Sequence, residues 1–437
     1  MNRPPIQLDD ALRDALAEEP RRGLAFEVAD ELGTLIRTTP QERPFLDLGA
    51  YRLFWLDATA RARTWRVMIV AALVLAMVVA LLAVGSRPTD VLPANGLVVL
   101  GSDRAGLYVA DPRTGTSTQL VPPWPANPSG RTNRSDLIAV SPSGDRLAFV
   151  IAGVRGWSIP IVALPSGTRL GEITDPRPEV LPEWAIEWSH DGSRLFLEAT
   201  VAGLGRILAA DPVGGGLTDV GAPDAVSRDV APSPVDGRVA FVQTTTAFDD
   251  DFRLVVWDPA TAGIAEVLAA TSDGAAVAGS PAWAPDGRTL LVTMARPDRT
   301  FAIARVDADG SNVSVVTPWL DRWPSGQWSP DGERLLVVVA PQGGRPADIY
   351  TNDDQRSELF LLAPDGGDWR RIVERACHNA TWSPDGSSIV YERGTCEDPP
   401  GAAEVRVIGA DGTGDRVVWS GDSRITSRLS IGWQGLP

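Results

Sequence analysis

The sequence predicts an all-β protein, a seven-bladed β-propeller, preceded by one transmembrane helix and a short helical segment. Three observations carry this prediction. Gly and Pro are abundant, with 42 and 36 of 437 residues, which favours many turns and short strands. A Trp-Ser-Pro-Asp-Gly pattern followed by an apolar strand recurs along the chain. One uninterrupted apolar run precedes the first of these repeats.

The repeated pattern predicts a tight turn between two antiparallel strands. Pro presets φ at the second turn position, Ser and Asp can bond backbone N–H groups, and Gly accepts a left-handed exit. The copies lie 45 to 54 residues apart. Clear copies begin at Trp188, Trp283, Trp328 and Trp382, degenerate copies begin at Val140 and Ser233, and a seventh Trp, Trp433, stands near the end of the chain.

Each repeat is long enough for four strands. Asp-Gly pairs at 309–310, 365–366 and 411–412 mark a second turn in three repeats. One four-stranded sheet cannot bury both of its faces, but sheets stacked around an axis can.

The number of blades follows from counting hairpins. Six complete hairpins give six blades. Residues 97–121 supply three further strands without a first one, and residues 431–434 supply a first strand without followers. Joining the two ends of the chain would complete a seventh blade and remove open sheet edges. A six-bladed ring is the alternative.

The tandem Trp-Ser-Pro-Asp-Gly repeats resemble the TolB-type, WD-like propeller repeats over residues 96–437. This resemblance implies a protein-interaction scaffold at a bacterial cell envelope, although TolB itself has six blades. The same repeats occur in propeller domains of prolyl-oligopeptidase-type peptidases. Those enzymes need a hydrolase domain with a Gly-x-Ser-x-Gly elbow, which this sequence lacks.

Residues 67–84 predict a membrane span. These 18 residues carry no polar side chain, and at ~1.5 Å per residue they approach the ~30 Å hydrocarbon layer. Three Arg residues and Trp65 lie just before the run, which predicts a cytoplasmic N-terminus. A cleaved signal peptide is the alternative, but signal peptides have short leading regions. The predicted parts are a cytoplasmic segment (1–66), the span (67–85), a linker (86–95) and an extracytoplasmic propeller (96–437).

Residues 1–66 read as short amphipathic helices. Their place before a single span vaguely resembles membrane-anchored anti-sigma factors. The zinc-type members of that family carry a His-x3-Cys-x2-Cys motif, whereas this segment contains neither His nor Cys. The segment therefore either docks a cytoplasmic partner or only anchors the chain.

Nearly all long insertions of the repeats fall on one predicted face of the propeller, which we call the loop face. It carries the loops between second and third strands and the connections between blades. Long loops on a rigid scaffold commonly carry binding residues. The candidates there are Trp124, Trp184, Trp319, Trp323, Asp249, Asp250, Asp251, Asp353 and Asp354. The alternative is that the Trp side chains fill gaps between blades and that the carboxylates are merely solvated.

Cys377 and Cys396 are predicted to form a disulfide. Folding the chain about the turn at 385–386 brings the two opposite each other, and an extracytoplasmic location favours oxidation. Two Cys and two His exclude a Cys/His zinc cluster or an iron–sulfur site. No spaced Ca²⁺-binding loop is present either. No metal and no cofactor are expected.

These observations favour a non-catalytic binding module that recognises an envelope protein, peptide or glycan. A net charge of −16 argues against a nucleic-acid partner. One alternative is a transmembrane signalling regulator that uses residues 1–66. Another is a lyase or hydrolase that uses carboxylates in the funnel of the propeller, which a central cluster of inward carboxylates would favour.

Overall fold

The computed structural model describes residues 92–102, 106–122, 137–153, 156–175, 177, 180–213, 216–222, 224–244, 251–340, 357–377, 379–394, 402–421 and 429–436. The predicted cytoplasmic segment and transmembrane helix lie outside these ranges. Within them, no helix has the length and apolarity needed to cross a membrane. All of the described secondary structure is β-strand.

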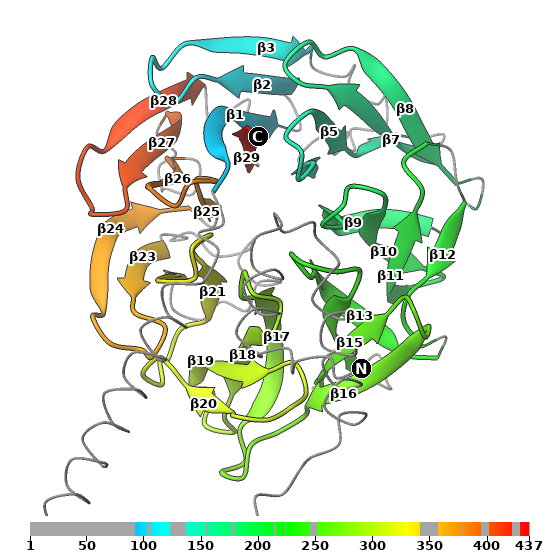
Figure 1. Ribbon diagram of the computed structural model, residues 1–437, viewed down its shortest axis with the longest axis vertical. Helices are drawn as coiled ribbons and strands as arrows, with labels where there is room; N and C mark the ends of the chain where they lie inside the picture. Colours follow the sequence, from blue (N-terminus) through cyan, green and yellow to red (C-terminus); the bar gives the residue numbers. More distant parts are fainter. Residues whose placement is uncertain are drawn as a thin grey trace, which may run out of the picture. The chain divides into compact units, whose positions relative to one another are not determined.

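Seven antiparallel sheets are arranged as a ring around a central axis (Figure 1). The first blade holds β29 (Leu429–Leu436), β1 (Ala94–Ser102), β2 (Gly106–Ala110) and β3 (Ser117–Val121). The second holds β4 (Ile138–Val140), β5 (Arg146–Phe149), β6 (Ile151–Gly153), β7 (Gly156–Ala163) and β8 (Arg169–Thr174). The third holds β9 (Val180–Trp188), β10 (Leu195–Val201), β11 (Leu204–Ala210) and β12 (Leu217–Asp219).

The remaining four blades follow in chain order. The fourth holds β13 (Val226–Pro232), β14 (Val239–Thr244), β15 (Arg253–Asp258) and β16 (Gly263–Leu268). The fifth holds β17 (Ala276–Trp283), β18 (Thr289–Ala295), β19 (Phe301–Asp307) and β20 (Ser314–Val315). The sixth holds β21 (Pro324–Trp328), β22 (Leu335–Val339), β23 (Ser357–Leu362) and β24 (Arg370–Ala376). The seventh holds β25 (Ala380–Trp382), β26 (Ser388–Arg393), β27 (Ala403–Gly409) and β28 (Arg416–Gly421).

The first blade is closed by both ends of the propeller. The last strand, β29, pairs antiparallel with β1, and Trp433 lies opposite Val98. This pairing confirms the predicted seven-bladed ring, and the six-bladed alternative is wrong. Because β29 covers the edge of β1, the ring closes between these two strands.

The repeated turn has the predicted geometry. In the third blade, Ser189 Oγ donates to Asp191 Oδ1 at 2.6 Å, and Arg194 N–H donates to Ser189 Oγ at 2.9 Å. Gly192 has φ +65°, the left-handed value that this turn position requires. Hydrogen bonds from Ser189 and Ser193 hold the pKa of Asp191 well below its usual range.

The apolar core lies between neighbouring blades. One large cluster joins strands of the second and third blades, and another joins the fourth and fifth. Trp188 and Trp283 are buried in these two clusters. Their indole N–H groups donate to Ala139 O at 3.0 Å and to Ala231 O at 2.9 Å, each in the preceding blade. At these two positions the repeat Trp fixes one blade against another, whereas the indole N–H groups of Trp328, Trp382 and Trp433 have no hydrogen-bond partner among the residues that the structure describes.

An Arg that follows the turn makes a second contact between blades. The Arg146 guanidinium lies 4.7 Å from the ring centre of Trp188 and donates to Gly192 O at 3.0 Å. Arg238 repeats this two blades later, at 4.9 Å from Trp283 and 2.6 Å from Gly287 O. We call this pair of contacts the Arg–Trp clasp.

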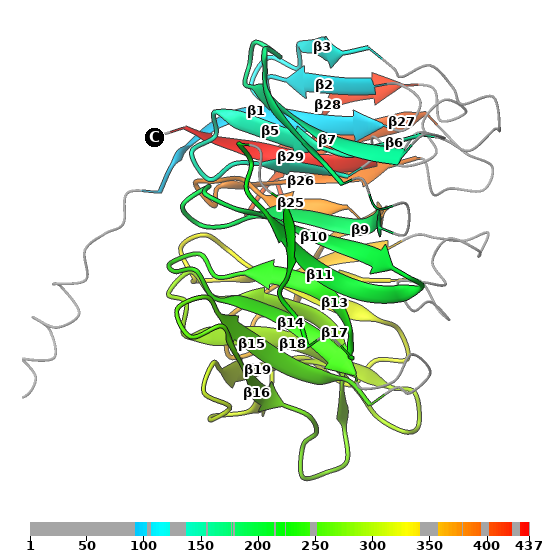
Figure 2. The same cartoon turned by 90° about the vertical axis from the view of Figure 1, so that its right-hand side faces the viewer.

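The two faces of the ring differ. The Ser-x-x-Gly turns lie on one face, which we call the turn face, and β1 and the C-terminus reach the ring on that side (Figure 2). Asn95 marks this entry, because its Oδ1 accepts a hydrogen bond from the N–H of Asp385 in the seventh-blade turn at 3.2 Å. The opposite face is the loop face.

Candidate functional site

The predicted aromatic candidates on the loop face do not form an open stacking surface where the structure describes them. Trp323 is only 5% exposed, and its ring packs on Phe301 with centroids 5.2 Å apart. Trp319 is half-buried, and the Arg296 guanidinium covers it at 3.8 Å. Both rings therefore serve packing, which is the alternative that the sequence left open. Trp124 and the side chain of Trp184 lie outside the described part of the structure.

Of the predicted acidic candidates, the structure describes only Asp251. It is exposed, and its Oδ2 lies 3.9 Å from an Arg253 nitrogen. Asp249, Asp250, Asp353 and Asp354 lie outside the described residues. Asp251 is thus a solvated carboxylate with one loose ion-pair partner.

The structure instead gathers charged side chains on strands of the third and fourth blades. Glu187 on β9, Glu198 on β10, and Arg228 and Asp229 on β13 form this group, which we call the axial cluster. β9 and β13 are the innermost strands of their sheets (Figure 1). Glu187 and Glu198 lie on the face of the third blade that carries Phe196, and that face packs against the fourth blade.

Hydrogen bonds connect the axial cluster across three blades. The backbone N–H of Asp229 donates to Glu198 Oε2 at 2.9 Å. The Asp229 carboxylate in turn accepts the N–H of Ser280 on β17 at 3.1 Å. Arg228 donates to Ala278 O at 3.0 Å, and its guanidinium lies 3.7 Å above the ring of Phe252. Its Nε is 4.0 Å from Asp229 Oδ2, too far for a close ion pair.

The backbone at the axial cluster is irregular. Asp229 and Ser280 have φ values of +58° and +55°, which non-glycine residues rarely adopt. Each lies in a bulge of its inner strand. Gly279 permits the close approach, because a Cβ there would lie 2.4 Å from Asp229 Oδ2. Backbone strain of this kind is concentrated at functional sites in proteins. Here it directs the Asp229 carboxylate toward the N–H of Ser280.

The carboxyl groups of the axial cluster hold protons more strongly than usual. Burial raises the pKa of Glu198 to about 8, and the nearby Asp229 charge adds to this effect. Burial also raises the pKa of Asp229. Glu187 contacts solvent, yet desolvation by the surrounding protein raises its pKa to about 7. Glu198, the buried member of the group, can therefore exchange its proton near neutral pH.

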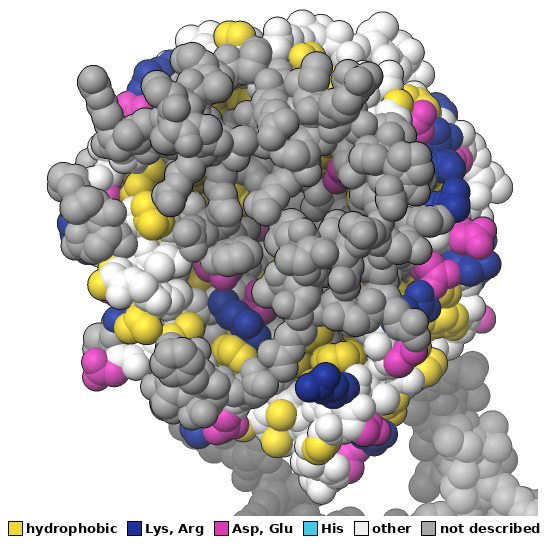
Figure 3. Space-filling model, turned by 180° about the vertical axis from the view of Figure 1, so that it is seen from behind, with side chains coloured by type: hydrophobic (Ala, Val, Ile, Leu, Met, Phe, Trp, Pro, Cys, Tyr) yellow, Lys and Arg dark blue, Asp and Glu magenta, His cyan; other side chains and the backbone are white. Residues whose placement is uncertain are grey.

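The axial cluster is partly accessible. The side chains of Arg228 and Asp229 are 36% and 35% exposed, whereas Glu198 is buried. The loop face shows acidic and basic side chains next to each other near its middle (Figure 3). Within the described ranges, no three His, Cys, Asp or Glu side chains are placed to hold a metal ion.

The repeat pattern and loop lengths do not indicate the axial cluster, although the sequence carries one signal of it. Glu198 stands ten residues after the repeat Trp188 and interrupts an otherwise apolar second strand. Glu392 occupies the same position after Trp382 and is also buried, with Asn379 Nδ2 donating to its Oε2 at 3.0 Å. A carboxylate at this repeat position thus marks a buried polar site. Nothing in the sequence indicates the left-handed backbone at Asp229.

The predicted disulfide is only partly covered by the structure. Cys377 is buried just after β24, and its N–H donates to Glu392 O at 2.7 Å. Cys396 lies outside the described residues, so the bridge stays a prediction. The repeat residues Trp188, Trp283, Trp382 and Trp433 are buried, and Trp328 is half-buried.

Comparisons with solved structures place the chain among propeller folds. No family model and no curated protein matches it. The tricorn protease is similar with a TM-score of 0.54 and 14% identity, over 78% of this chain and 34% of that one. TolB from Acinetobacter baumannii gives 0.46 and 15%, over 79% and 89%. An oligogalacturonate lyase in complex with manganese gives 0.49 and 14%, over 78% and 96%. At these identities only the fold is shared.

Proposed function

We propose that this protein is a non-catalytic binding module, anchored in the bacterial cytoplasmic membrane with its propeller outside the cytoplasm. Its partner would be an envelope protein, peptide or glycan. The observation that supports binding is the axial cluster, which presents two partly exposed carboxyl groups on a rigid closed ring. The apolar run at 67–84 and the Arg residues before it support the membrane anchor.

The charges of the axial cluster favour a cationic group on the ligand. Glu198 and Asp229 meet there, and Glu187 lies on the same face of the third blade as Glu198. Glu198 and Glu187 have pKa values raised to about 8 and about 7. A cation placed beside them would stabilise their charged forms and lower those pKa values. Arg228 fills this role only in part. Its charge lowers the pKa values of Glu198 and Asp229, but its guanidinium is directed to Ala278 O and to the Phe252 ring. A basic side chain of a peptide fits best.

Site-specific photo-crosslinking in intact cells tests this proposal. A photoreactive residue replaces Glu187 in the full chain, and a matched control replaces Glu266, which is exposed on the outermost strand β16. We expect an adduct with an envelope peptide or protein from position 187 only, lost when Asp229→Asn is added. Equal adducts from both positions, or adducts with cytoplasmic proteins alone, would contradict the proposal.

A second candidate function is acid–base catalysis, favoured by the raised pKa values of Glu198 and Asp229 and by the strained backbone at Asp229. A protonated Glu198 could act as a general acid, and an ionised neighbour as a base. Release of new reducing ends from envelope glycans would reveal a hydrolase or lyase. Such activity, abolished by Glu198→Gln while ligand binding persists, would replace the non-catalytic proposal.

The third candidate, a signalling regulator, differs from the first only in the role of residues 1–66. The full chain and a variant lacking residues 1–60 can be compared by crosslinking on the cytoplasmic side. A specific cytoplasmic partner of the full chain would favour signalling. If the truncated chain crosslinks to the same partners as the full chain, residues 1–66 serve only as an anchor.

A further inference from the structure

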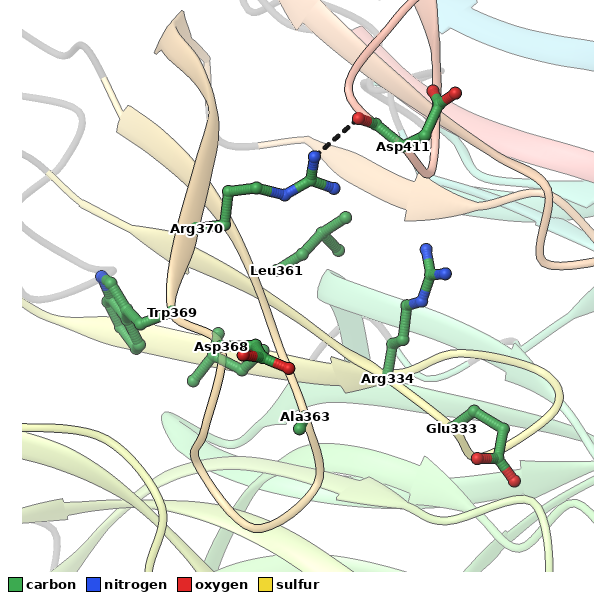
Figure 4. A pocket seen from close by; sticks show the side chains of 9 residues that line it. Glu333, Arg334, Leu361, Ala363, Asp368, Trp369, Arg370 and Asp411 are labelled. Atoms are coloured by element: carbon green, nitrogen blue, oxygen red, sulfur yellow. Dashed lines mark hydrogen bonds between the residues drawn. The ribbon is translucent and has the colours of Figure 1, made fainter.

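A cavity of about 630 Å³ opens on the turn face between the sixth and seventh blades (Figure 4). It lies away from the axial cluster, which belongs to the third and fourth blades. Its lining comes from the turn before β22, from the turn between β23 and β24, and from the turn between β27 and β28. The lining residues are Glu333, Arg334, Leu361, Leu362, Ala363, Asp368, Trp369, Arg370 and Asp411.

Two arginines converge in this cavity. Arg334 and Arg370 extend toward the Asp411 loop from different sides, with Leu361 between them (Figure 4). Arg334 donates to Ala410 O at 3.0 Å. Arg370 donates to the same oxygen at 3.1 Å and to Asp411 O at 2.6 Å. One carbonyl oxygen thus holds two guanidinium groups side by side.

Neither guanidinium forms an ion pair in the described part of the chain, although the Arg370 charge helps to lower the pKa of the Asp411 carboxyl. Arg334 uses one and Arg370 two of their five N–H donors for backbone oxygens there. The Asp411 carboxylate is occupied by its own turn, because its Oδ1 accepts the N–H and the hydroxyl of Thr413 at 2.9 and 2.8 Å. Two adjacent cations therefore keep most of their donors for a ligand, in a protein of net charge −16.

The corresponding cavity between the fourth and fifth blades is also lined by two arginines and three acidic residues, but its arginines have different partners. There Arg238 donates to Asp236 Oδ2 at 2.9 Å and lies on the Trp283 ring. Asp286, Asp307 and Asp309 also line that cavity. Arg288 lines that cavity as well. Of its two arginines Arg238 is already paired, and no carbonyl oxygen joins the two guanidinium groups within the described residues. The unpaired arrangement at Arg334 and Arg370 is therefore not a general feature of the repeat.

We propose that the cavity between the sixth and seventh blades binds a phosphate group. A phosphate offers several acceptor oxygens, which suits donors from two planar guanidinium groups. Leu361, Leu362 and the half-buried Trp369 supply an apolar wall for the organic part of a phosphate ester. The site is distinct from the axial cluster and does not depend on the function proposed for that cluster.

The phosphate could come from a soluble ester or from a lipid headgroup. A second cavity, lined by Arg334 and by Ser387 of the seventh-blade turn, adjoins the first. Asn95 Nδ2 lies 3.5 Å from Ser387 Oγ, so β1 enters the ring beside these cavities. The predicted membrane span ends only about ten residues earlier, at residue 85. The experiment therefore has to separate the two sources.

Titration of inorganic phosphate into the full chain in a neutral detergent, followed by calorimetry, tests the site. We expect saturable binding that weakens about tenfold or more in Arg370→Gln, the loss expected for one charge-assisted hydrogen bond. Arg370→Lys should retain part of the affinity. The matched control Arg288→Gln, in the cavity between the fourth and fifth blades, should bind as the unaltered protein does. A thermal melt checks that Arg370→Gln stays folded.

Two results would overturn the proposal. One is the absence of saturable phosphate binding, and the other is an equal loss of affinity in Arg370→Gln and Arg288→Gln. Repeating the titration in nanodiscs distinguishes a lipid headgroup from a soluble phosphate ester as the natural ligand. If lipid headgroups occupy the site, phosphatidylglycerol discs weaken phosphate binding relative to phosphatidylcholine discs. If the ligand is a soluble ester, both discs give the same affinity, and glycerol 1-phosphate competes with phosphate in both.

Discussion

Glu198 is the residue whose burial most clearly disfavours its charged form. Its side chain is buried, and its pKa is raised to about 8 from an ordinary value near 4.5. The unfolded chain releases this proton at the lower pH, while the folded chain retains it. This group therefore makes the free energy of unfolding fall as pH rises from about 4.5 to about 8.

Replacing Glu198 by Gln should remove that pH dependence. The Gln oxygen can still accept the Asp229 N–H, but no charge forms at high pH. Relative to the unaltered protein, Glu198→Gln should be more stable at pH 9 by roughly 1–3 kcal/mol, with a much smaller difference at pH 4. Urea unfolding at both pH values measures this. An exposed control, Glu266→Gln, should show no such change, and a Glu198→Gln variant less stable at pH 9 would contradict the buried-acid interpretation.

For single residues, the sequence predicts a structural role well where the role is local and recurs in each repeat. It predicts poorly a role that occurs only once in the chain. Ser189, Asp191 and Gly192 act within one turn, so their roles follow from the turn chemistry alone. The Asp229 site depends on two bulges in different blades, which no local pattern specifies. Trp323 was predicted on a binding face, but long-range packing on Phe301 buries it.

Between elements, the Arg–Trp clasp is the contact most open to a direct test. Arg238 joins the fourth blade to the fifth through a hydrogen bond to Gly287 O and through the Trp283 ring. Arg238→Gln should lower the free energy of unfolding by about 1–2 kcal/mol, since both a charge-assisted hydrogen bond and a cation–π contact are lost. Chemical denaturation measures the change.

The control for this prediction is Arg288→Gln. Arg288 is exposed, and its side chain makes no hydrogen bond or ion pair within the described residues. Its replacement should change stability by less than about 0.5 kcal/mol. Equal effects of the two substitutions would show that the clasp contributes nothing specific.

The strands themselves were largely predictable, because the turn pattern and the apolar runs repeat at regular spacing. The structure departs from the simple four-strand pattern in the second blade. There β5 and β6 both pair with β7, so one strand position is filled by two short strands. The Arg–Trp clasp was not predicted, because it joins residues 42 to 49 positions apart in different repeats.

For the whole molecule, closure of the ring by β29 is the feature on which stability should depend most. Removal of residues 429–437 would expose the edge of β1 and leave the first blade without its inner strand. We expect that this truncated chain no longer unfolds in one cooperative thermal transition and that it aggregates. Removal of Pro437 alone should change neither property. Calorimetry with size-exclusion chromatography measures both. A truncated chain that stays monomeric with an unchanged transition would contradict closure as the main stabilising contact.

Display of the propeller outside the cytoplasm is the claim on which the proposed function depends most. Val213 is 89% exposed in the turn between β11 and β12, so Val213→Cys offers a thiol without disturbing the core. The most direct measurement is labelling of spheroplasts with a membrane-impermeant maleimide, with Thr64→Cys in the predicted cytoplasmic segment as the matched control. We expect Val213→Cys to be labelled in intact spheroplasts and Thr64→Cys only after lysis. Labelling of Val213→Cys only after lysis would contradict the proposed location and, with it, recognition of an envelope ligand.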